Sequence, residues 1–271
     1  MLNLLSCSWT DIDALDPARR ILLMVLGPTE QHGPHLPLGT DIFAANEMSR
    51  RMAEIMEDEC GQIVVEAPPL YFTPAVLSRE FPGSVSIRKH HYRAFLSDVL
   101  TSYADNGLHQ AVLVSSHIDP PFVLATQRVC QEINQKYGTR YISGYERFPL
   151  EDITYNRTQA VFGYEKSGDV HAGLMETSNT LLIRPDLVKT QLLPHLEPQP
   201  MTFEVMAQLR SLKNFALGQG YTGYPAEAQA HFGTLWFARY GEMFGNILRD
   251  YCRGEDVFER LSIEHLLPSS P

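Results

Sequence analysis

The chain has 271 residues, of which 44% are hydrophobic and 20% are charged, and its formal net charge at pH 7 is −10. This composition is that of a globular protein long enough to bury a sizeable core. The acidic balance, with Lys and Arg scattered along the chain, argues against a nucleic-acid partner and against docking on an anionic membrane.

The sequence contains no apolar run that approaches the roughly 18–20 residues needed to span a bilayer. Its N-terminus, Met1 to Trp9, has no basic lead and does not resemble a signal peptide. The four cysteines are far apart and form no Cys-x-x-Cys pair: Cys7, Cys60, Cys130 and Cys252. We therefore expect reduced thiols in a cytoplasmic protein.

Short apolar runs alternate with amphipathic stretches. Arg20–Leu26 is a continuous apolar run that ends at Gly27, which suits a strand buried on both faces. Further strands are predicted over Ile63–Ala67, Ala111–Ser115 and Arg140–Ser143, and helices over Ala44–Asp58, Lys89–Asn106, Pro121–Tyr137, Glu176–Leu182, Phe203–Leu217 and Ala226–Tyr251. The alternation predicts an α/β fold with a mainly parallel central sheet, in a single domain over residues 1–271. Such sheets place their sites in loops just past the carboxyl ends of strands.

The loop after the first of these strands carries a first cluster of polar residues. Glu30 and His32 are two apart, so in an extended segment their side chains point the same way, and Asp41 follows a Pro/Gly-rich loop that can fold back towards them. Carboxylate oxygen and imidazole nitrogen are the ligands expected for Zn²⁺, Mn²⁺ or Fe²⁺. The alternative is a polar turn in which Asp41 only caps the following helix.

A second polar pair follows the strand Ala111–Ser115. His117 and Asp119 are again two apart, and if the two strands are neighbours in the sheet the two pairs converge. The alternative is an exposed histidine followed by a helix N-cap at Asp119, because Asp-Pro-Pro is good capping chemistry.

A third cluster contains His171 and Glu176, separated by the small residues Ala172 and Gly173. His171 is a candidate general acid or base or a substrate binder, and Glu176 a candidate base or metal ligand. The alternative is a helix start with Glu176 in its first turn, where the helix dipole favours an acidic residue.

Taken together, these motifs resemble the creatininase family (creatinine amidohydrolases and relatives). The Glu-Gln-His-Gly core of the family's first motif is similar to residues 30–33, and its metal-bridging Asp corresponds to Asp41. Phe81–Ser84 resembles its F-P-G-T segment, His171–Ser178 its H-A-G-x-x-E-T-S motif, and Gly223 to Gly241 its C-terminal G-x-P…A…G helix. The resemblance covers nearly the whole chain.

The resemblance implies a three-layer α/β/α fold and two divalent metal ions per chain. By position, Glu30, Asp41 and His117 would bind one ion, His32 and Asp41 would share the other, and His171 would match a catalytic histidine. It also implies a small-molecule substrate and a homo-oligomer, commonly a hexamer in this family.

One segment departs from the family pattern. Most relatives carry N-G-H-G-G-N after the third strand, whereas this chain has Ser115 to Pro120, with Ile118 beside the histidine. Creatininase itself has H-x-E there, so Asp119 is a candidate ligand of the second ion; Glu176 is the other, and we favour it because its motif is intact. The departure also leaves the substrate open.

The predicted reaction is attack of a metal-bridged hydroxide on a carbonyl, which hydrolyses a C–N bond of a cyclic or linear amide. His171 would protonate the leaving group, with Glu176 as a further catalytic candidate. A second possibility is ring opening of a carbocyclic ketone, such as an oxidised inositol, or of a lactone. A third is a non-catalytic metal- or ligand-binding relative, which we disfavour because none of the predicted ligands is missing.

Overall fold

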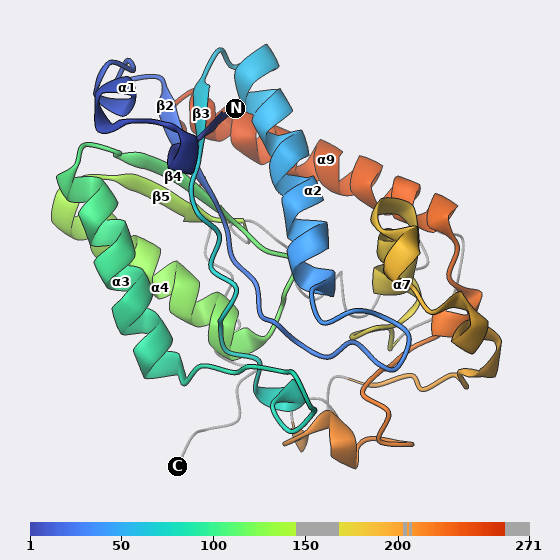
Figure 1. Ribbon diagram of the computed structural model, residues 1–271. Coiled ribbons are helices and arrows are strands. Elements are labelled where there is room, and N and C mark those ends of the chain that lie inside the picture. Colours follow the sequence, from blue (N-terminus) through green and yellow to red (C-terminus); the bar gives the residue numbers. More distant parts are fainter. Residues whose placement is uncertain (145–167, 203–204, 206–207, 258–271) are drawn as a thin grey trace.

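The computed structural model describes residues 1–144, 168–202, 205 and 208–257. In these residues five parallel strands form a sheet (Figure 1). In spatial order the strands are β1 (Leu2–Asn3), β3 (Ile63–Glu66), β2 (Arg20–Val25), β4 (Gln110–Val114) and β5 (Arg140–Ser143). Because every strand runs the same way, their carboxyl ends meet at a single edge of the sheet.

The centre of the sheet is its most buried part. All six residues of β2 are buried, as its continuous apolar sequence predicts for a strand covered on both faces. β2 pairs directly with β4, with Val25 opposite Val114, so the loops that follow these two strands leave the sheet side by side.

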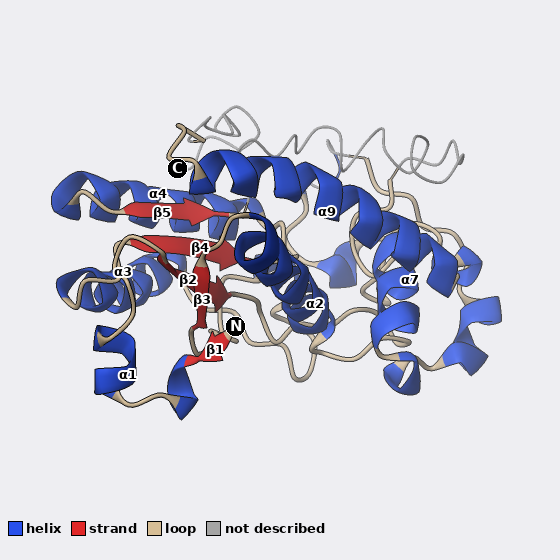
Figure 2. Cartoon of the chain, turned by 90° about the horizontal axis from the view of Figure 1, so that it is seen from above, coloured by secondary structure: helices blue, strands red, loops and turns tan. Residues whose placement is uncertain are grey.

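Helices cover both faces of the sheet, which confirms the predicted three-layer α/β/α fold. In Figures 1 and 2, α3 and α4 lie on one face and α2 and α9 on the other, with α7 packed against α2 and α9. Their bounds are α2 (Thr40–Glu54), α3 (Lys89–Asp105), α4 (Pro120–Tyr137), α7 (Leu174–Ile183) and α9 (Ala230–Cys252), and a short helix α1 (Trp9–Asp13) precedes β2. None of the helices in the described ranges is long and apolar enough to cross a membrane.

The start of α2 differs from the prediction in a way that matters for the site. The apolar periodicity begins at Ala44, but the helix begins at Thr40, and it ends at Glu54 with a π-helical turn over Ile55–Glu59. Thr40 donates its hydroxyl proton to the carbonyl of Pro37 (2.8 Å), which closes the turn before the helix. Asp41 consequently lies in the first helical turn and is 1% exposed.

The predicted helix Phe203–Leu217 is wrong in its second half; residues 203, 204, 206 and 207 lie outside the described residues. Residues 209–217 form turns and a short 3-10 helix, Leu212–Asn214, in which the Ser211 hydroxyl accepts a hydrogen bond from the Lys213 N–H. Ala216 adopts a left-handed φ of 44°, which no α-helix accommodates. Similarly, α9 begins at Ala230 rather than Ala226, because Pro225–Glu227 forms a 3-10 turn.

Truncation of a core residue of β2 tests this packing. Leu23 is 0% exposed at the middle of the sheet, so we expect Leu23→Ala to lower the free energy of unfolding by about 2–5 kcal/mol, through lost burial and the cavity left behind. Leu5 is 76% exposed, and Leu5→Ala should change it by less than about 0.5 kcal/mol. Urea denaturation of both variants measures the difference, and equal effects would contradict the assigned core.

Candidate metal centre

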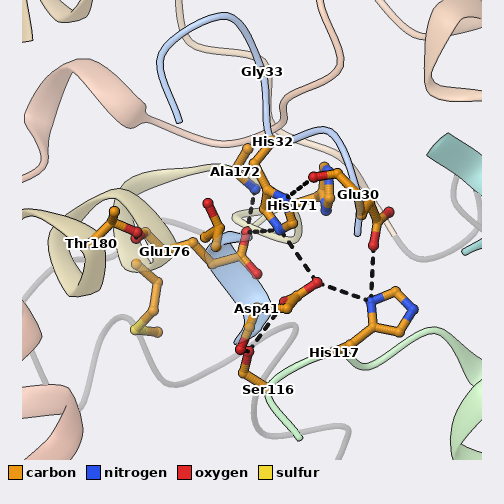
Figure 3. Close-up of polar contacts among 12 residues, drawn as sticks. Glu30, His32, Gly33, Asp41, Ser116, His117, His171, Ala172, Glu176 and Thr180 are labelled. Carbon is orange, nitrogen blue, oxygen red and sulfur yellow. Dashed lines mark hydrogen bonds and ion pairs between the residues drawn. The ribbon is translucent and has the colours of Figure 1, made fainter. Parts of the chain in front are cut away.

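Six of the seven predicted site residues meet at the carboxyl edge of the sheet. Glu30 and His32 lie on the loop after β2, Asp41 in the first turn of α2 and His117 on the loop after β4. His171 and Glu176 come from the start of α7, far along the chain. Figure 3 shows Asp41 between His32 and His117, with Glu30 beside His117 and Glu176 beside His32.

The first of two ligand groups consists of Glu30, Asp41 and His117, all of them buried. His117 Nδ1 lies 3.1 Å from Glu30 Oε2 and 3.5 Å from Asp41 Oδ2. The other ring nitrogen, Nε2, donates to the carbonyl oxygen of Pro74 (2.9 Å), so Nδ1 is the nitrogen that faces the two carboxylates. Such an outer hydrogen bond fixes the ring and its tautomer for metal binding.

The second group consists of His32, His171 and Glu176. His32 Nε2 lies 3.7 Å from Glu176 Oε2 and also 3.6 Å from Asp41 Oδ2. His32 Nδ1 donates to the carbonyl oxygen of Glu30 (3.0 Å), which turns Nε2 towards these carboxylates. Asp41 Oδ2 therefore faces a histidine of each group, which is the position of a bridging ligand.

The donor atoms of this centre fit a divalent cation. Glu30 Oε2, His32 Nε2 and Asp41 Oδ2 are buried, and within the described residues none of the three makes a hydrogen bond of good geometry. Each instead faces other ligands of the centre at 3.1 to 3.7 Å. Buried carboxylates and imidazoles that converge in this way need a positive charge between them, and so mark a site for a cation. Oxygen and imidazole nitrogen are donors that suit Zn²⁺, Mn²⁺ and Fe²⁺.

Two neighbours hold these ligands in place. The sequence patterns do not identify Ser116, whereas His35, within the first loop, is a candidate for supporting the ligands or facing the substrate. Ser116 donates from its hydroxyl to the carboxylate (3.1 Å) and the carbonyl oxygen (3.0 Å) of Asp41. His35 is fully buried, and its Nε2 lies 2.9 Å from the hydroxyl of Thr177, so it joins the first loop to α7. A serine beside a histidine carries no signal of its contact with Asp41 in a single sequence.

Asp119 is the predicted ligand that the structure does not bring into either group. It precedes α4 as its N-cap residue, but the cap contacts come from its backbone oxygen, which accepts from the N–H groups of Phe122 and Val123. Its side chain accepts from the N–H of Val76 (3.0 Å). Glu176, by contrast, lies beside His32, and its carboxylate accepts from the N–H of Ala172. Of the two candidates for the second ion, the geometry favours Glu176.

The backbone that leads into α7 has an unusual conformation, which sets the positions of the polar side chains at the start of this helix. Ala172 adopts a left-handed φ of 50°, which is uncommon for a residue with a Cβ and marks local strain. Asp169 accepts hydrogen bonds from the N–H groups of Leu174 (2.7 Å) and Met175 (3.0 Å) and so satisfies the first turn of the helix. Glu176 is left to face the metal centre.

Charge compensation shapes the acidity of the two ligand histidines. Burial alone would favour a neutral His32 ring, but the carboxylates of Asp41 and Glu176 raise its pKa to about 10. Burial likewise opposes the charged form of His117, and Glu30 and Asp41 raise its pKa well above the ordinary value. In the absence of a metal ion, these carboxylates therefore hold a proton on each ring.

His171 and Glu176 have different environments. Burial and the nearby His32 lower the pKa of His171 to about 4, so its ring is neutral at pH 7. Burial raises the pKa of Glu176 to about 7, although about a quarter of this side chain is exposed. The ring of His171 packs against that of His32, with centroids 4.4 Å apart and the planes tilted by 34°. In the tautomer with a proton on Nε2, His171 donates to the carbonyl oxygen of Gln31 (2.8 Å).

A pocket opens beside this centre, between α2, α7 and α9. His171, Glu176 and Ser116 lie at its polar end. The rest of its wall is mainly apolar and includes Met48, Ile118, Met175, Trp236, Tyr240 and Phe244. Ile118, which belongs to the segment that departs from the family pattern, is one of the residues that line this pocket. A concave apolar pocket with a few convergent polar groups is typical of a substrate site.

Comparison with known proteins identifies the family. The family model described as creatinine amidohydrolase matches residues 6–248. The chain belongs to the creatininase family. Members are metal-dependent hydrolases, and this chain is an enzyme of that type.

Curated members of the creatininase family differ in their named activities. The chain is 31% identical over 222 residues to a mycofactocin precursor peptide peptidase of Mycolicibacterium smegmatis, covering 80% of each chain. It is 23% identical to a creatinine amidohydrolase of Pseudomonas putida, covering 67% of this chain and 71% of that one. It is 24% identical to a 3-dehydro-scyllo-inosose hydrolase of Thermotoga maritima, covering 66% of this chain and 55% of that one.

Solved structures share the creatininase fold. The structure of a putative creatinine amidohydrolase from Bacteroides fragilis matches with a TM-score of 0.68 at 19% identity, covering 95% of this chain and 98% of that one. A creatininase variant described as its Zn–Zn type matches with a TM-score of 0.66 at 18% identity, covering 92% of this chain and 97% of that one. At these identities the likeness concerns the fold.

Metal binding to this centre should release protons. A metal ion needs the nitrogen lone pairs of His32 and His117, whose raised pKa values keep both rings protonated at pH 7. We expect chelator-treated protein to release at least two protons per chain at pH 7 when Zn²⁺ fills the site, one from each ring and a further fraction from Glu176, and its affinity for Zn²⁺ to rise with pH. Calorimetric titrations in buffers of different ionisation enthalpy count these protons.

A pair of histidine variants controls this measurement. His117→Ala should release about one proton fewer than the parent chain. His109 is exposed and outside the centre, so His109→Ala should match the parent. Metal uptake without proton release would contradict the charge state assigned to these ligands.

Proposed function

We propose that this enzyme hydrolyses the C–N bond of an amide at a dinuclear centre formed by Glu30, His32, Asp41, His117 and Glu176. The observation that carries this proposal is the convergence of buried carboxylate and imidazole atoms of Glu30, His32, Asp41 and His117, with Asp41 facing both groups. A bound pair of divalent ions, which we expect to be Zn, Mn or Fe, would polarise a carbonyl and supply a nucleophile from water near neutral pH.

His171 has the position and charge state of a proton-transfer group. It is half-buried at the polar end of the pocket, and its neutral ring can accept a proton and pass it to a leaving nitrogen. The contact with the Gln31 carbonyl and the ring contact with His32 hold the imidazole of His171 in a fixed orientation beside the ligands. His171 also lies in the second ligand group, so its share in metal binding has to be measured along with activity.

A linear amide such as a peptide bond is the bond we favour. The support comes from the 31% identity to a peptidase over 80% of both chains, which exceeds the identity to the creatinine and inosose hydrolases. Ring opening of a carbocyclic ketone stays a second candidate, because the inosose hydrolase is a relative over 66% of this chain. A substrate panel of short peptides, cyclic amides, lactones and inososes separates these reactions.

Removal of the bridging carboxylate should disable the centre. We expect about two divalent ions per chain in the parent, measured by plasma mass spectrometry on protein without a polyhistidine tag, and a sharp fall in Asp41→Ala together with loss of hydrolysis. Asp98 is exposed on α3, and Asp98→Ala should keep both metal and activity. Full metal content in Asp41→Ala would contradict the bridging role.

Replacement of His171 should affect turnover more than substrate binding. If His171 transfers the proton, His171→Ala should lower kcat by about 10²–10⁴-fold with little change in KM, and added imidazole should restore part of the rate. Metal content measured on the same sample separates this loss from loss of an ion. The exposed control His109→Ala should leave kcat unchanged, and an unaltered kcat in His171→Ala would exclude His171 as the proton-transfer group.

A further inference from the structure

One polar side chain of the pocket wall belongs to neither ligand group and keeps a buried polar atom without a hydrogen-bond partner in the described part of the chain. Asn179 follows Glu176 by one turn of α7 and lines the same pocket. Residues three apart on a helix share a face, so Asn179 lies on the same face of α7 as Glu176. Asn179 is 3% exposed, and its Oδ1 has no hydrogen-bond partner within the described ranges.

The neighbouring polar residues of α7 show how unusual this is. Thr180 donates its hydroxyl proton to the carbonyl oxygen of Glu176 (2.8 Å), and the hydroxyl of Ser178 accepts from the N–H of Gln229 (3.1 Å). Thr177 meets His35. Each of these buried side chains has a structural hydrogen bond, whereas the amide oxygen of Asn179, a residue of the pocket wall, has none among the described residues. A buried acceptor without a partner costs stability, of the order of 1–3 kcal/mol in mutational studies, so its retention needs a reason outside the free protein.

The wall opposite α7 suits a large apolar group. Trp236 and Tyr240 of α9 stack with ring centroids 4.0 Å apart, and Tyr240 and Phe244 continue the row at 5.9 Å. All three line the pocket (Figure 2 shows α7 and α9 packed side by side). Aromatic rings receive flat or bulky apolar groups well, and they exclude water from a hydrogen bond beside them.

We propose that Asn179 is a substrate-binding residue, whose side-chain amide accepts a hydrogen bond from an N–H of the substrate. The aromatic row of Trp236, Tyr240 and Phe244 receives the large apolar side chain attached next to that N–H. The substrate class is a peptide-like amide with a bulky apolar residue close to the bond that is cut. This inference rests on the proposed amide hydrolysis, and it assigns the group that orients the substrate rather than the group that cuts it.

A leucine substitution separates binding from folding. Leu has nearly the shape of Asn and no polar atom, so Asn179→Leu should keep or raise the melting temperature and keep the metal content. Asn46 is an exposed asparagine on α2, and Asn46→Leu is the matched control. The chain has two tryptophans, and Trp9 is 78% exposed, so in a Trp9→Phe background the fluorescence of Trp236 reports directly on the pocket.

Metal-loaded proteins in this background are titrated with N-acetylphenylalaninamide and N-acetylalaninamide. We expect the phenylalanine probe to bind the parent and Asn46→Leu more tightly than the alanine probe does. In Asn179→Leu the Kd of the phenylalanine probe should rise on the order of tenfold. The KM of a peptide substrate with a bulky apolar residue should rise in parallel, with a smaller change in kcat.

The outcomes distinguish this inference from the proposed reaction. Unchanged probe affinity in Asn179→Leu, or a lowered melting temperature with unchanged affinity, would show that Asn179 is only structural and would overturn the inference. Failure of both probes to bind the parent would overturn it as well, even if the enzyme hydrolyses other amides. Probe binding that depends on Asn179, without hydrolysis of any amide, would instead remove the proposed reaction and leave the binding site in place.

Discussion

Buried negative charge is the constraint on which this structure depends. The carboxylates of Glu30 and Asp41 are removed from water at the edge of the sheet, where an unpaired charge is far too costly to be retained. Two imidazoles face them, each held by a backbone carbonyl through its other nitrogen. The arrangement requires a positive charge, supplied by protons or by metal ions, and the rest of the fold serves to keep these groups from moving apart.

The sheet provides that rigidity through its register. β2 and β4 are adjacent and parallel, so Glu30 and His117 follow neighbouring strand ends. The two remaining carboxylates come from first turns of helices: Asp41 from α2 and Glu176 from α7. Strand ends and helix starts are the least mobile places from which a loop side chain can be presented, so a ligand set gathered from four segments keeps a defined geometry.

The sequence predicts this arrangement as far as local patterns extend. The strands β2 and β4 are predictable because each is a continuous apolar run. The polar pairs that follow them converge because the carboxyl ends of neighbouring parallel strands lie at the same edge of the sheet. Apolar periodicity does not predict the early start of α2, because Thr40 and Asp41 are polar residues that are nevertheless buried. The helix expected up to Leu217 fails because periodicity says nothing about the backbone of Ala216.

The limits at the site itself have the same physical origin. Asp119 and Glu176 are equivalent candidates by residue type. Only the fold shows that the Asp119 carboxylate accepts a hydrogen bond from the N–H of Val76, while the Glu176 carboxylate lies beside His32. Ser116 and Asn179 carry no motif, because a hydrogen bond to Asp41 and a missing partner in a pocket are facts of tertiary structure. The resemblance to a family thus predicts the division of the ligands into two groups, while the choice between Asp119 and Glu176 and the contacts of Ser116 and Asn179 need the structure.

The ligands come from chain segments that are distant in sequence, from Glu30 to Glu176. Ions held by the two ligand groups would cross-link the β2 loop, α2, the β4 loop and α7 in the folded chain, and the unfolded chain would lack these cross-links. Binding to the folded state alone adds to its stability by mass action, in proportion to the logarithm of the free metal concentration. The lifetime of this protein in a cell would then follow the supply of metal, so that starvation for the ion lowers the amount of enzyme as well as its activity.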